Sequence, residues 1–243
     1  MAFHPLLETL IDAFFPPRCA GCTQWCREAI CPLCQPKLRP IGAPLCDHCG
    51  APFDPVAYAA PVCAACRAKP PHFVAARSAF HFDGPIRESI HRLKYREKKA
   101  LAPRLVPLLK EAIEGDQVLA NFAPQFIVPV PLHAARLRQR GFNQSFLLAD
   151  ELGHLIGVPA IELLKRTRST PPQVKLDRAD RLKNVRGAFE VNKATFNKLG
   201  ASGARILLID DVFTTGATLG ECARTLQKAG TGAICALTLG RQA

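Results

Sequence analysis

The pattern of hydrophobic and polar positions divides the chain near residue 73. Beyond that point, short apolar runs typical of buried strands recur between segments whose apolar residues have helical spacing. Strands are predicted at 73–82, 125–132, 187–191, 205–210 and 232–239. Helices are predicted at 84–93, 100–114, 144–156 (after Asn143 as a cap) and 218–230. This alternation predicts an α/β fold, in which a parallel sheet carries helices on both faces and binds ligands at the carboxyl ends of its strands.

The first 72 residues have a different character, because they hold nine of the eleven cysteines. The charge changes at the same place: residues 1–72 carry a net charge of +1, and residues 73–243 carry a net charge of +11. Pro70 and Pro71 mark a linker between the two parts. We therefore expect two domains, 1–72 and 73–243.

The N-terminal segment has the pattern of a short amphipathic helix over residues 3–15, which Pro16 and Pro17 end. It is too acidic, and has too few basic residues, for a signal peptide. The sequence contains no run of eighteen apolar residues, so no membrane span is predicted. We expect the protein to be cytoplasmic.

Four Cys-x-x-Cys pairs stand in the first 72 residues. Two thiolates three positions apart on a tight turn face one point, and two such turns complete a tetrahedral Zn²⁺ site. Disulfides are the alternative, but they would not require the same spacing four times, and they are typical of secreted chains. We predict two structural zinc sites formed by successive turns, since this pairing closes shorter loops than an interleaved one. The predicted ligands are Cys19, Cys22, Cys31 and Cys34 for one site, and Cys46, Cys49, Cys63 and Cys66 for the other.

Two adjacent aspartates, Asp210 and Asp211, come directly after four aliphatic residues at the end of a predicted strand. Neighbouring carboxylates repel each other and are costly to bury, so this position requires a partner that is cationic or rich in hydroxyl groups. The loop TTGAT (214–218) leads from there into a predicted helix, where backbone N–H groups and threonine hydroxyls can hold a phosphate monoester. A ribose with its 2′ and 3′ hydroxyls fits the acidic pair beside such a phosphate. The alternative, an aspartate that merely caps the helix, does not require two carboxylates in tandem.

Several segments together resemble one known family. ILLIDDVFTTGATL (206–219) is similar to the phosphoribosyl pyrophosphate motif of type I phosphoribosyltransferases. With FPPRCAGC (15–22), the later cysteine pairs and the segments 93–105, 129–152 and 164–191, the chain resembles the ComF (competence protein F) family over nearly its whole length. The resemblance implies a type I phosphoribosyltransferase fold, a parallel sheet with flanking helices, preceded by a small double zinc ribbon.

The resemblance also implies roles for individual residues. Asp210 and Asp211 would bind the ribose hydroxyls, and any transfer chemistry would depend on them. The residues that would hold the 5′-phosphate are Thr214, Thr215, Gly216, Ala217 and Thr218. The pyrophosphate would lie at Pro131, Leu132 and His133, beside a basic loop with Arg136, Arg138 and Arg140. Mg²⁺ would bridge pyrophosphate and ribose oxygens while keeping most of its waters.

Three functions remain open at this stage. The first is an active phosphoribosyltransferase of nucleotide salvage, in which the protein orients phosphoribosyl pyrophosphate and stabilises the departing pyrophosphate. The second is a phosphoribosyl pyrophosphate-binding protein of natural competence, whose partners would be incoming single-stranded DNA and DNA-uptake proteins. The Arg/Lys-rich stretches 136–142 and 164–186 favour such contact with nucleic-acid phosphates. The third is a zinc-ribbon adaptor or regulator that senses phosphoribosyl pyrophosphate. The motif indicates binding and not turnover, so fold and motif alone do not separate these functions.

Overall fold

The structure is a computed structural model that describes residues 17–53, 61–95, 100–169 and 183–242. The helix predicted at 3–15 lies outside the described residues. The same holds for residues 170–182, which form the middle of the basic stretch 164–186. None of the helices in the described part of the chain combines the length and the apolar character that crossing a membrane requires.

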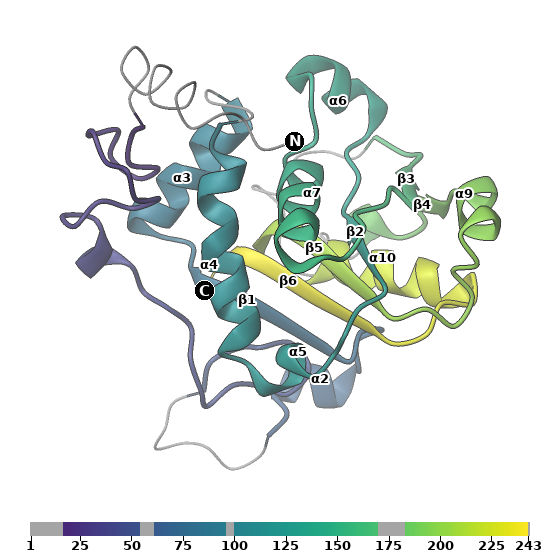
Figure 1. Cartoon of the computed structure of the whole chain (residues 1–243). Coiled ribbons are helices and arrows are strands. Elements are labelled where there is room, and N and C mark those ends of the chain that lie inside the picture. Colours follow the sequence, from purple (N-terminus) through teal and green to yellow (C-terminus); the bar gives the residue numbers. More distant parts are fainter. Residues whose placement is uncertain (1–16, 54–60, 96–99, 170–182, 243) are drawn as a thin grey trace.

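Four parallel strands form the main sheet, in the order β1-β6-β5-β2 (Figure 1). They are β1 (Ala75–His81), β6 (Ile234–Arg241), β5 (Ile206–Phe213) and β2 (Phe126–Pro129). The predicted parallel sheet is thus confirmed, and the carboxyl ends of its strands meet at one edge. Strand β5 continues beyond the predicted end at residue 210, because β6 pairs with it as far as Phe213 and Arg241. Asp210 and Asp211 therefore lie within the strand.

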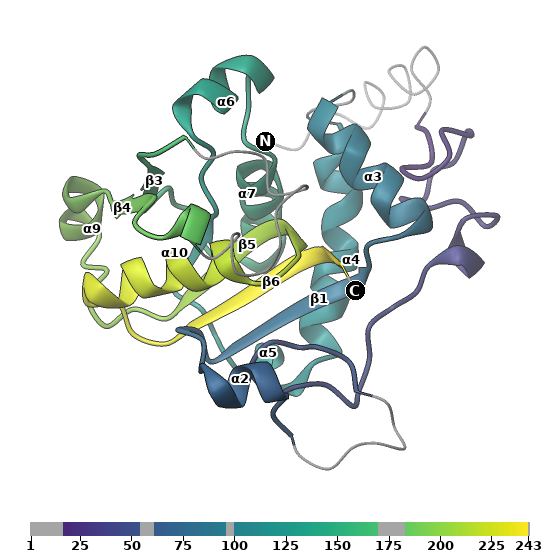
Figure 2. The ribbon, with the colours of Figure 1, turned by 180° about the vertical axis from the view of Figure 1, so that it is seen from behind.

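Helices cover both faces of the sheet, as predicted. On one face lie α3 (Gly84–Tyr95), α4 (Ala102–Glu114) and α7 (Gln144–Ile156), of which α4 and α7 are seen in front of the strands in Figure 1. On the other face lies α10 (Ala217–Lys228), which is nearer the viewer in Figure 2. An apolar core lies on each face of the sheet, and alternate residues of β5 point into one or the other. Leu207 and Ile209 pack on the α4 side, and Ile206 and Leu208 pack on the α10 side.

The smaller elements lie around this sheet. They are η1 (Gln35–Lys37), α2 (Ala64–Ala68), α5 (Gln117–Ala120), α6 (Ala134–Arg140), β3 (Leu164–Arg166), β4 (Phe189–Val191) and α9 (Lys193–Lys198). The strand predicted at 187–191 corresponds to β4, which pairs antiparallel with β3 outside the main sheet. The expected basic loop with Arg136, Arg138 and Arg140 is instead the helix α6. This helix buries none of its residues, so it leaves no hydrophobic periodicity in the sequence.

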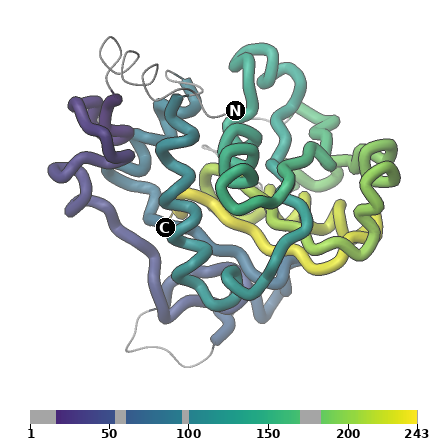
Figure 3. Tube along the Cα trace, in the orientation of Figure 1, coloured from purple at the N-terminus to yellow at the C-terminus, as the bar shows by residue number. Residues whose placement is uncertain are grey.

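The cysteine-rich segment runs along the β1 edge of the sheet, and its colour in Figure 3 passes from purple to blue. Backbone hydrogen bonds join it to β1 at Ile41 N–H to Ala79 O (3.0 Å) and at His81 N–H to Arg39 O (2.9 Å). Its residues Cys19, Ile30 and Cys31 belong to the same apolar core as the sheet. The segment therefore shares its core with the sheet, and the domain boundary at residues 72 and 73 stays a prediction.

Candidate functional site

The eight predicted metal ligands form two groups, and in each group the four sulfur atoms lie within 4.8 Å of one another. One group is Cys19, Cys22, Cys31 and Cys34, and the other is Cys46, Cys49, Cys63 and Cys66. The pairing of successive turns is thus confirmed. Four sulfur donors at this spacing fit a structural Zn²⁺ ion whose whole coordination shell comes from the protein.

Backbone N–H groups favour the thiolate form that a metal requires. The N–H of Cys31 donates to Cys19 Sγ (3.3 Å), and the N–H of Cys63 donates to Cys46 Sγ (3.3 Å). Burial raises the pKa of Cys19, but these N–H donors outweigh it and lower the pKa to about 6. The same balance lowers the pKa of Cys46 to about 7. In each group one thiolate is thus favoured, whereas burial raises the pKa of Cys34 in the first group and of Cys66 in the second.

Arginines attach the first cysteine group to the helices. Arg92 of α3 is buried, and its Nη1 donates to Cys19 O (2.7 Å) and Ala20 O (2.8 Å). Arg104 of α4 donates to Cys26 O (2.9 Å). The turn around Cys19 is thus fixed to α3 by a cation that satisfies two carbonyl groups.

The second cysteine group is attached to the sheet through three consecutive carbonyls of residues 47–49. They accept hydrogen bonds from Arg77 Nη1 (3.0 Å), Ala76 N–H (2.6 Å) and Arg241 Nη1 (2.7 Å), in that order. Next in the chain, Gly50 has a positive φ of 66°, and a Cβ there would lie 2.3 Å from Ala76 O. Only glycine allows this close approach, so the turn lies directly against β1 and β6.

The acidic pair of Asp210 and Asp211 lies at the carboxyl end of β5, among polar side chains from the α3 and α7 helices. Ser145 Oγ donates to Asp210 Oδ1 (2.8 Å), and the N–H of Asp211 donates to the same oxygen (2.9 Å). Asp211 is 5% exposed and forms an ion pair with Lys94. The cationic partner that the sequence required is therefore supplied, in part, by the protein itself.

The two carboxyl groups have different acidities. Burial and the charge of Asp211 raise the pKa of Asp210 to about 7. Burial also acts to raise the pKa of Asp211, but the charge and hydrogen bond of Lys94 outweigh it and hold the pKa below the usual value. Near neutral pH, the site thus contains one ionised carboxylate and one that exchanges a proton in the physiological range.

The predicted phosphate loop, residues 214–218 (called the phosphate loop below), joins β5 to the first turn of α10. Gly216 is the N-cap of α10 in a left-handed conformation (φ 76°), and Thr215 Oγ1 accepts the N–H of Ala217 (3.4 Å) at this helix end. A Cβ at Gly216 would lie 2.7 Å from Phe213 Cζ, so both the backbone angle and the ring below require glycine. The N-terminus of a twelve-residue helix points its N–H groups and positive dipole end at this loop.

The predicted pyrophosphate residues form the turn between β2 and α6. Pro131 and Leu132 precede His133, whose Nδ1 accepts the N–H of Ala135 (3.2 Å) as the cap of α6. Asn143 holds this region together, since its Nδ2 donates to Val130 O (3.0 Å). The turn is thereby fixed beside the start of α7.

Asn143 also caps α7, as predicted, because its Oδ1 accepts the N–H of Ser145 (3.1 Å). One buried amide therefore positions both the turn after β2 and the serine that contacts Asp210. Of the three arginines of α6, Arg140 lies over the ring of Tyr95 (5.2 Å to the centroid), while Arg136 and Arg138 are exposed.

Three residues near the acidic pair are absent from the site predicted by the sequence: Lys94, Ser145 and Arg166. Burial lowers the pKa of Arg166, and the nearby charges of Asp210 and Arg136 act on it in opposite directions. Arg166 also forms a β-bridge with His133, which brings β3 next to the turn at residues 131–133. The only signal for these three residues was their presence in segments that carried the family resemblance.

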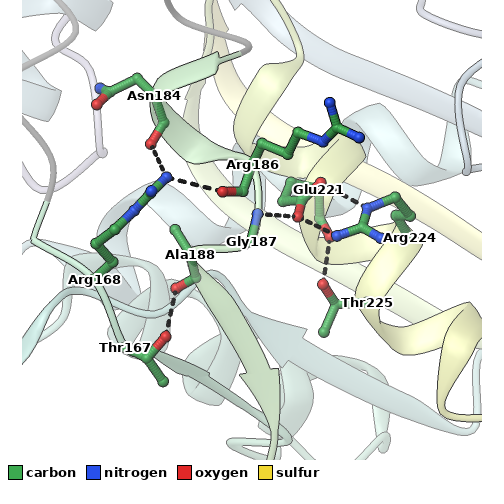
Figure 4. Close-up of polar contacts among 9 residues, drawn as sticks. All are labelled: Thr167, Arg168, Asn184, Arg186, Gly187, Ala188, Glu221, Arg224 and Thr225. Carbon is green, nitrogen blue, oxygen red and sulfur yellow. Dashed lines mark hydrogen bonds and ion pairs between the residues drawn. The ribbon is translucent and has the colours of Figure 1, made fainter.

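Behind the phosphate loop, Glu221 of α10 joins this helix to the chain that leads into β4 (Figure 4). Its buried carboxylate accepts the N–H of Gly187 (2.6 Å) and the Nε of Arg224 (2.8 Å). Arg168 Nη2 donates to the carbonyls of Asn184 (3.0 Å) and Arg186 (2.8 Å). Residues 184–187 are thus held from two sides, by α10 and by the residues after β3.

A cleft of about 1170 Å³ lies between the phosphate loop and the second cysteine group. Its wall includes Thr215 and Gly216 on one side and Cys49 and Cys63 on the other, with Arg241 also in the lining. The predicted phosphate site and the predicted second metal site therefore face the same space.

Comparison with known proteins gives a consistent result. Residues 10–67 match the family model of the double zinc ribbon domain. Competence protein F of Haemophilus influenzae is 30% identical over 89% of this chain and 93% of the relative. DNA utilization protein YhgH of Escherichia coli (strain K12) is 31% identical over 84% of this chain and 87% of the relative. Competence protein ComFC of Bacillus subtilis is 30% identical over 84% of this chain and 80% of the relative.

Among solved structures, the chain is similar to adenine phosphoribosyltransferases. For the Saccharomyces cerevisiae enzyme the TM-score is 0.39 at 15% identity, over 61% of this chain and 71% of that chain. For the Thermoanaerobacter pseudethanolicus enzyme the TM-score is 0.36 at 15% identity, over 59% of this chain and 82% of that chain.

Proposed function

Because the chain belongs to the competence protein F (ComF) family, we propose that it binds phosphoribosyl pyrophosphate with Mg²⁺ and acts in the handling of incoming single-stranded DNA. The observation that carries the proposal is the position of the acidic pair, Asp210 and Asp211, in β5 directly before the phosphate loop at the start of α10. Hydroxyl donors and a phosphate dianion are the two kinds of ligand group that these neighbouring features accept.

Each part of the ligand has a counterpart in the site. The 5′-phosphate accepts N–H groups at the α10 N-terminus, with hydroxyls of Thr214, Thr215 and Thr218 beside it. The ribose hydroxyls donate to Asp210 and Asp211. The pyrophosphate lies toward the turn at residues 131–133, with cations from α6 and β3 nearby.

Magnesium suits the donors at this edge. The carboxylate oxygens of Asp210 and Asp211 are hard ligands at the carboxyl end of the sheet, of the kind that Mg²⁺ prefers directly or through its waters. The ion, when bound, would supply charge neutralisation between pyrophosphate and ribose oxygens. The chain itself orients the sugar and places Lys94 next to the acidic pair.

Thermal unfolding tests the ligand assignment. Phosphoribosyl pyrophosphate with Mg²⁺ at about 100 times its Kd should stabilise the wild type by about 2.7 kcal/mol. The double variant Asp210→Asn/Asp211→Asn should lose this stabilisation. Asp150→Asn, which removes a half-exposed carboxylate from α7, should retain it. A wild type whose melting temperature does not respond to the ligand would contradict the proposal. Release of pyrophosphate with a panel of bases and amines would separately measure whether the sugar is transferred.

A second observation favours contact with nucleic acid. Helix α6 exposes Arg136 and Arg138, and it buries none of its seven residues. A helix without an apolar face is stabilised little by packing, and clustered arginines attract the phosphates of a strand independently of its sequence. This helix stands next to the proposed pyrophosphate turn. The names of the relatives, competence protein and DNA utilization protein, also support contact with nucleic acid.

Oligonucleotide binding at several salt concentrations tests this contact. For a single strand, the double variant Arg136→Gln/Arg138→Gln should weaken binding and reduce the slope of log K against log salt by about 1.4. Lys193→Gln/Lys198→Gln removes the same charge from the exposed face of α9 and should leave the slope near that of the wild type. Equal slopes for the α6 variant and the wild type would place the DNA contact elsewhere.

A further inference from the structure

Arg241, the last residue of β6, contacts Cys49 of the second cysteine group and the ring of Phe213, which lies under the phosphate loop. Its Nη1 donates to Cys49 O (2.7 Å), and its Nη2 lies 3.9 Å from Cys49 Sγ. On its other side, the guanidinium carbon lies 4.3 Å from the centroid of the Phe213 ring. Arg241 and Phe213 are direct partners in the β6–β5 register, so the stacking is set by the sheet.

The Phe213 ring in turn supports the phosphate loop. It is 4% exposed and lies so close under Gly216 that a Cβ there would be 2.7 Å from its Cζ. The backbone of Phe213 is also fixed, because its carbonyl accepts the N–H of Gln242 (2.9 Å). A change in the position of this ring therefore changes the position of Gly216, the N-cap of α10.

The charges on the two sides of Arg241 have the same sign. Four thiolates with one Zn²⁺ carry a net charge of −2, and a phosphate monoester carries about −1.5 to −2 near neutral pH. The cysteine group and the phosphate loop line one cleft, and Arg241 is part of its wall. A guanidinium between two anions reduces their repulsion, and its planar fork can donate to the metal site while its face rests on an aromatic ring.

We propose that Arg241 is a positioning residue that couples zinc binding at Cys46, Cys49, Cys63 and Cys66 to phosphate binding at the phosphate loop. This inference rests on the proposed binding of phosphoribosyl pyrophosphate. With zinc bound, the thiolate of Cys49 holds Arg241, which holds the Phe213 ring under Gly216 in the conformation that receives the phosphate. A hydrogen bond to a metal ligand commonly changes the affinity of the site for its metal. Here the donor, Arg241, would also change the affinity of the phosphate loop for its ligand.

The coupling is specific to one of the two metal sites. The first cysteine group is attached by Arg92, which contacts Cys19 and Ala20 from α3, and its four cysteines are not among the residues that line the cleft beside the phosphate loop. Because linkage is reciprocal, the ligand should strengthen zinc binding by the same factor by which zinc strengthens ligand binding. We therefore expect the ligand to protect one zinc ion per chain and to leave the other unaffected.

Competition with a chromogenic chelator measures this on the zinc-loaded full chain. In the wild type, phosphoribosyl pyrophosphate with Mg²⁺ should raise the affinity of one of two zinc ions by about fivefold or more. Arg241→Met keeps the apolar stem and removes the donor, and it should abolish this difference. Phe213→Leu leaves the hydrogen bond to Cys49 intact and should abolish the difference as well.

Arg77→Met is the matched control, made together with Asp116→Asn so that the carboxylate that pairs with Arg77 is not left without its counter-charge. Arg77 also donates to the same cysteine turn, at Asp47 O (3.0 Å), but it lies in β1 opposite Leu237, away from the phosphate loop. If Arg241 only fixed the ribbon to the sheet, the two arginine variants would behave alike. The proposal requires that ligand-dependent protection persist in Arg77→Met/Asp116→Asn and disappear in Arg241→Met.

The outcomes distinguish this inference from the proposed function. If the ligand stabilises the wild type but protects neither zinc ion, or protects one equally in wild type and Arg241→Met, the inference is wrong and the proposed function stands. If the ligand does not stabilise the wild type at all, the proposed function fails and the inference fails with it. Protection of a single zinc ion that depends on both Arg241 and Phe213 supports both.

Discussion

Lys94, in the last turn of α3, forms an ion pair with Asp211 in β5, 117 residues further along the chain. The Asp211 side chain is 7% exposed and that of Lys94 is 22% exposed, so the pair is largely removed from water. The same helix carries Arg92, which holds the turn of the first cysteine group. Two cations of helix α3 thus have separate partners: Lys94 pairs with the acidic pair, and Arg92 holds the turn of the first cysteine group.

The variant Lys94→Met should destabilise the protein by about 3 kcal/mol, because a buried carboxylate loses its counter-charge. Urea denaturation of the zinc-loaded protein measures this change. Adding Asp211→Asn to Lys94→Met removes the uncompensated charge and should recover most of the loss. If Lys94→Met unfolds at the same urea concentration as the wild type, the ion pair does not contribute as its burial indicates.

Asp210 should make stability depend on pH in a defined window. Its pKa is raised to about 7 in the folded protein, against about 3.9 in an unfolded chain. Between these values the folded state retains a proton that the unfolded state has lost. Stability from this group is therefore full below about pH 4 and declines as the pH rises to about 7. Above that pH it contributes no further change.

The comparison with Asp210→Asn isolates this effect. Asparagine keeps an oxygen that can accept from Ser145 and cannot ionise. The free energy of unfolding of the wild type, relative to this variant, should fall by on the order of 2 kcal/mol between pH 5 and pH 8. A difference that is constant over this range would show that Asp210 titrates with an ordinary pKa. Zinc affinity also varies with pH, but it affects both proteins alike.

Much of this architecture follows from local sequence patterns. The apolar runs that became β1, β2, β5 and β6 were found because a buried parallel strand needs consecutive apolar residues. The two cysteine groups were found because metal ligation imposes a fixed spacing on each turn. Asn143 was found as the cap of α7 because capping is decided within three residues.

The partners of the acidic pair could not be found in this way. Ser145 is 65 residues from Asp210, and only the packing of α7 against β5 brings them together. Lys94 has no distinguishing neighbour in the sequence, where it is one of several cations. Helix α6 was expected as a loop because it has no apolar face, and its ends are set by His133 and by the positive φ of Gly141. The partners of the acidic pair depend on contacts between segments that are far apart in the sequence, so a local pattern does not predict them.

Glu221→Ala should cost about 2 kcal/mol, because it leaves the N–H of Gly187 without its acceptor and separates Arg224 from its partner (Figure 4). Glu221→Gln keeps an acceptor for Gly187 and should lose less. Arg224→Met leaves the N–H of Gly187 with its acceptor, and this N–H still stabilises the charge of the buried carboxylate, so the variant should cost less than Glu221→Ala. Thermal or urea unfolding ranks the three variants. If Arg224→Met were as harmful as Glu221→Ala, the ion pair and not the hydrogen bond to Gly187 would be the main contribution.

Removal of zinc should destabilise the sheet as well as the ribbons, because the first cysteine group contributes Cys19, Cys31 and Cys34 to the core that also contains Leu237 of β6. Metal analysis should find two zinc ions per chain, and Cys31→Ser should retain one. Circular dichroism should then show one cooperative unfolding transition, lowered by at least about 10 °C in Cys31→Ser, since about 1 kcal/mol corresponds to 2–4 °C for a chain of this size.

Cys26→Ser is the control, because its thiol lies outside both groups and contacts Glu28, and it should keep both ions and the wild-type transition. A separate small transition for the ribbons, with the sheet unfolding at its original temperature, would mean that the shared core does not couple the two parts.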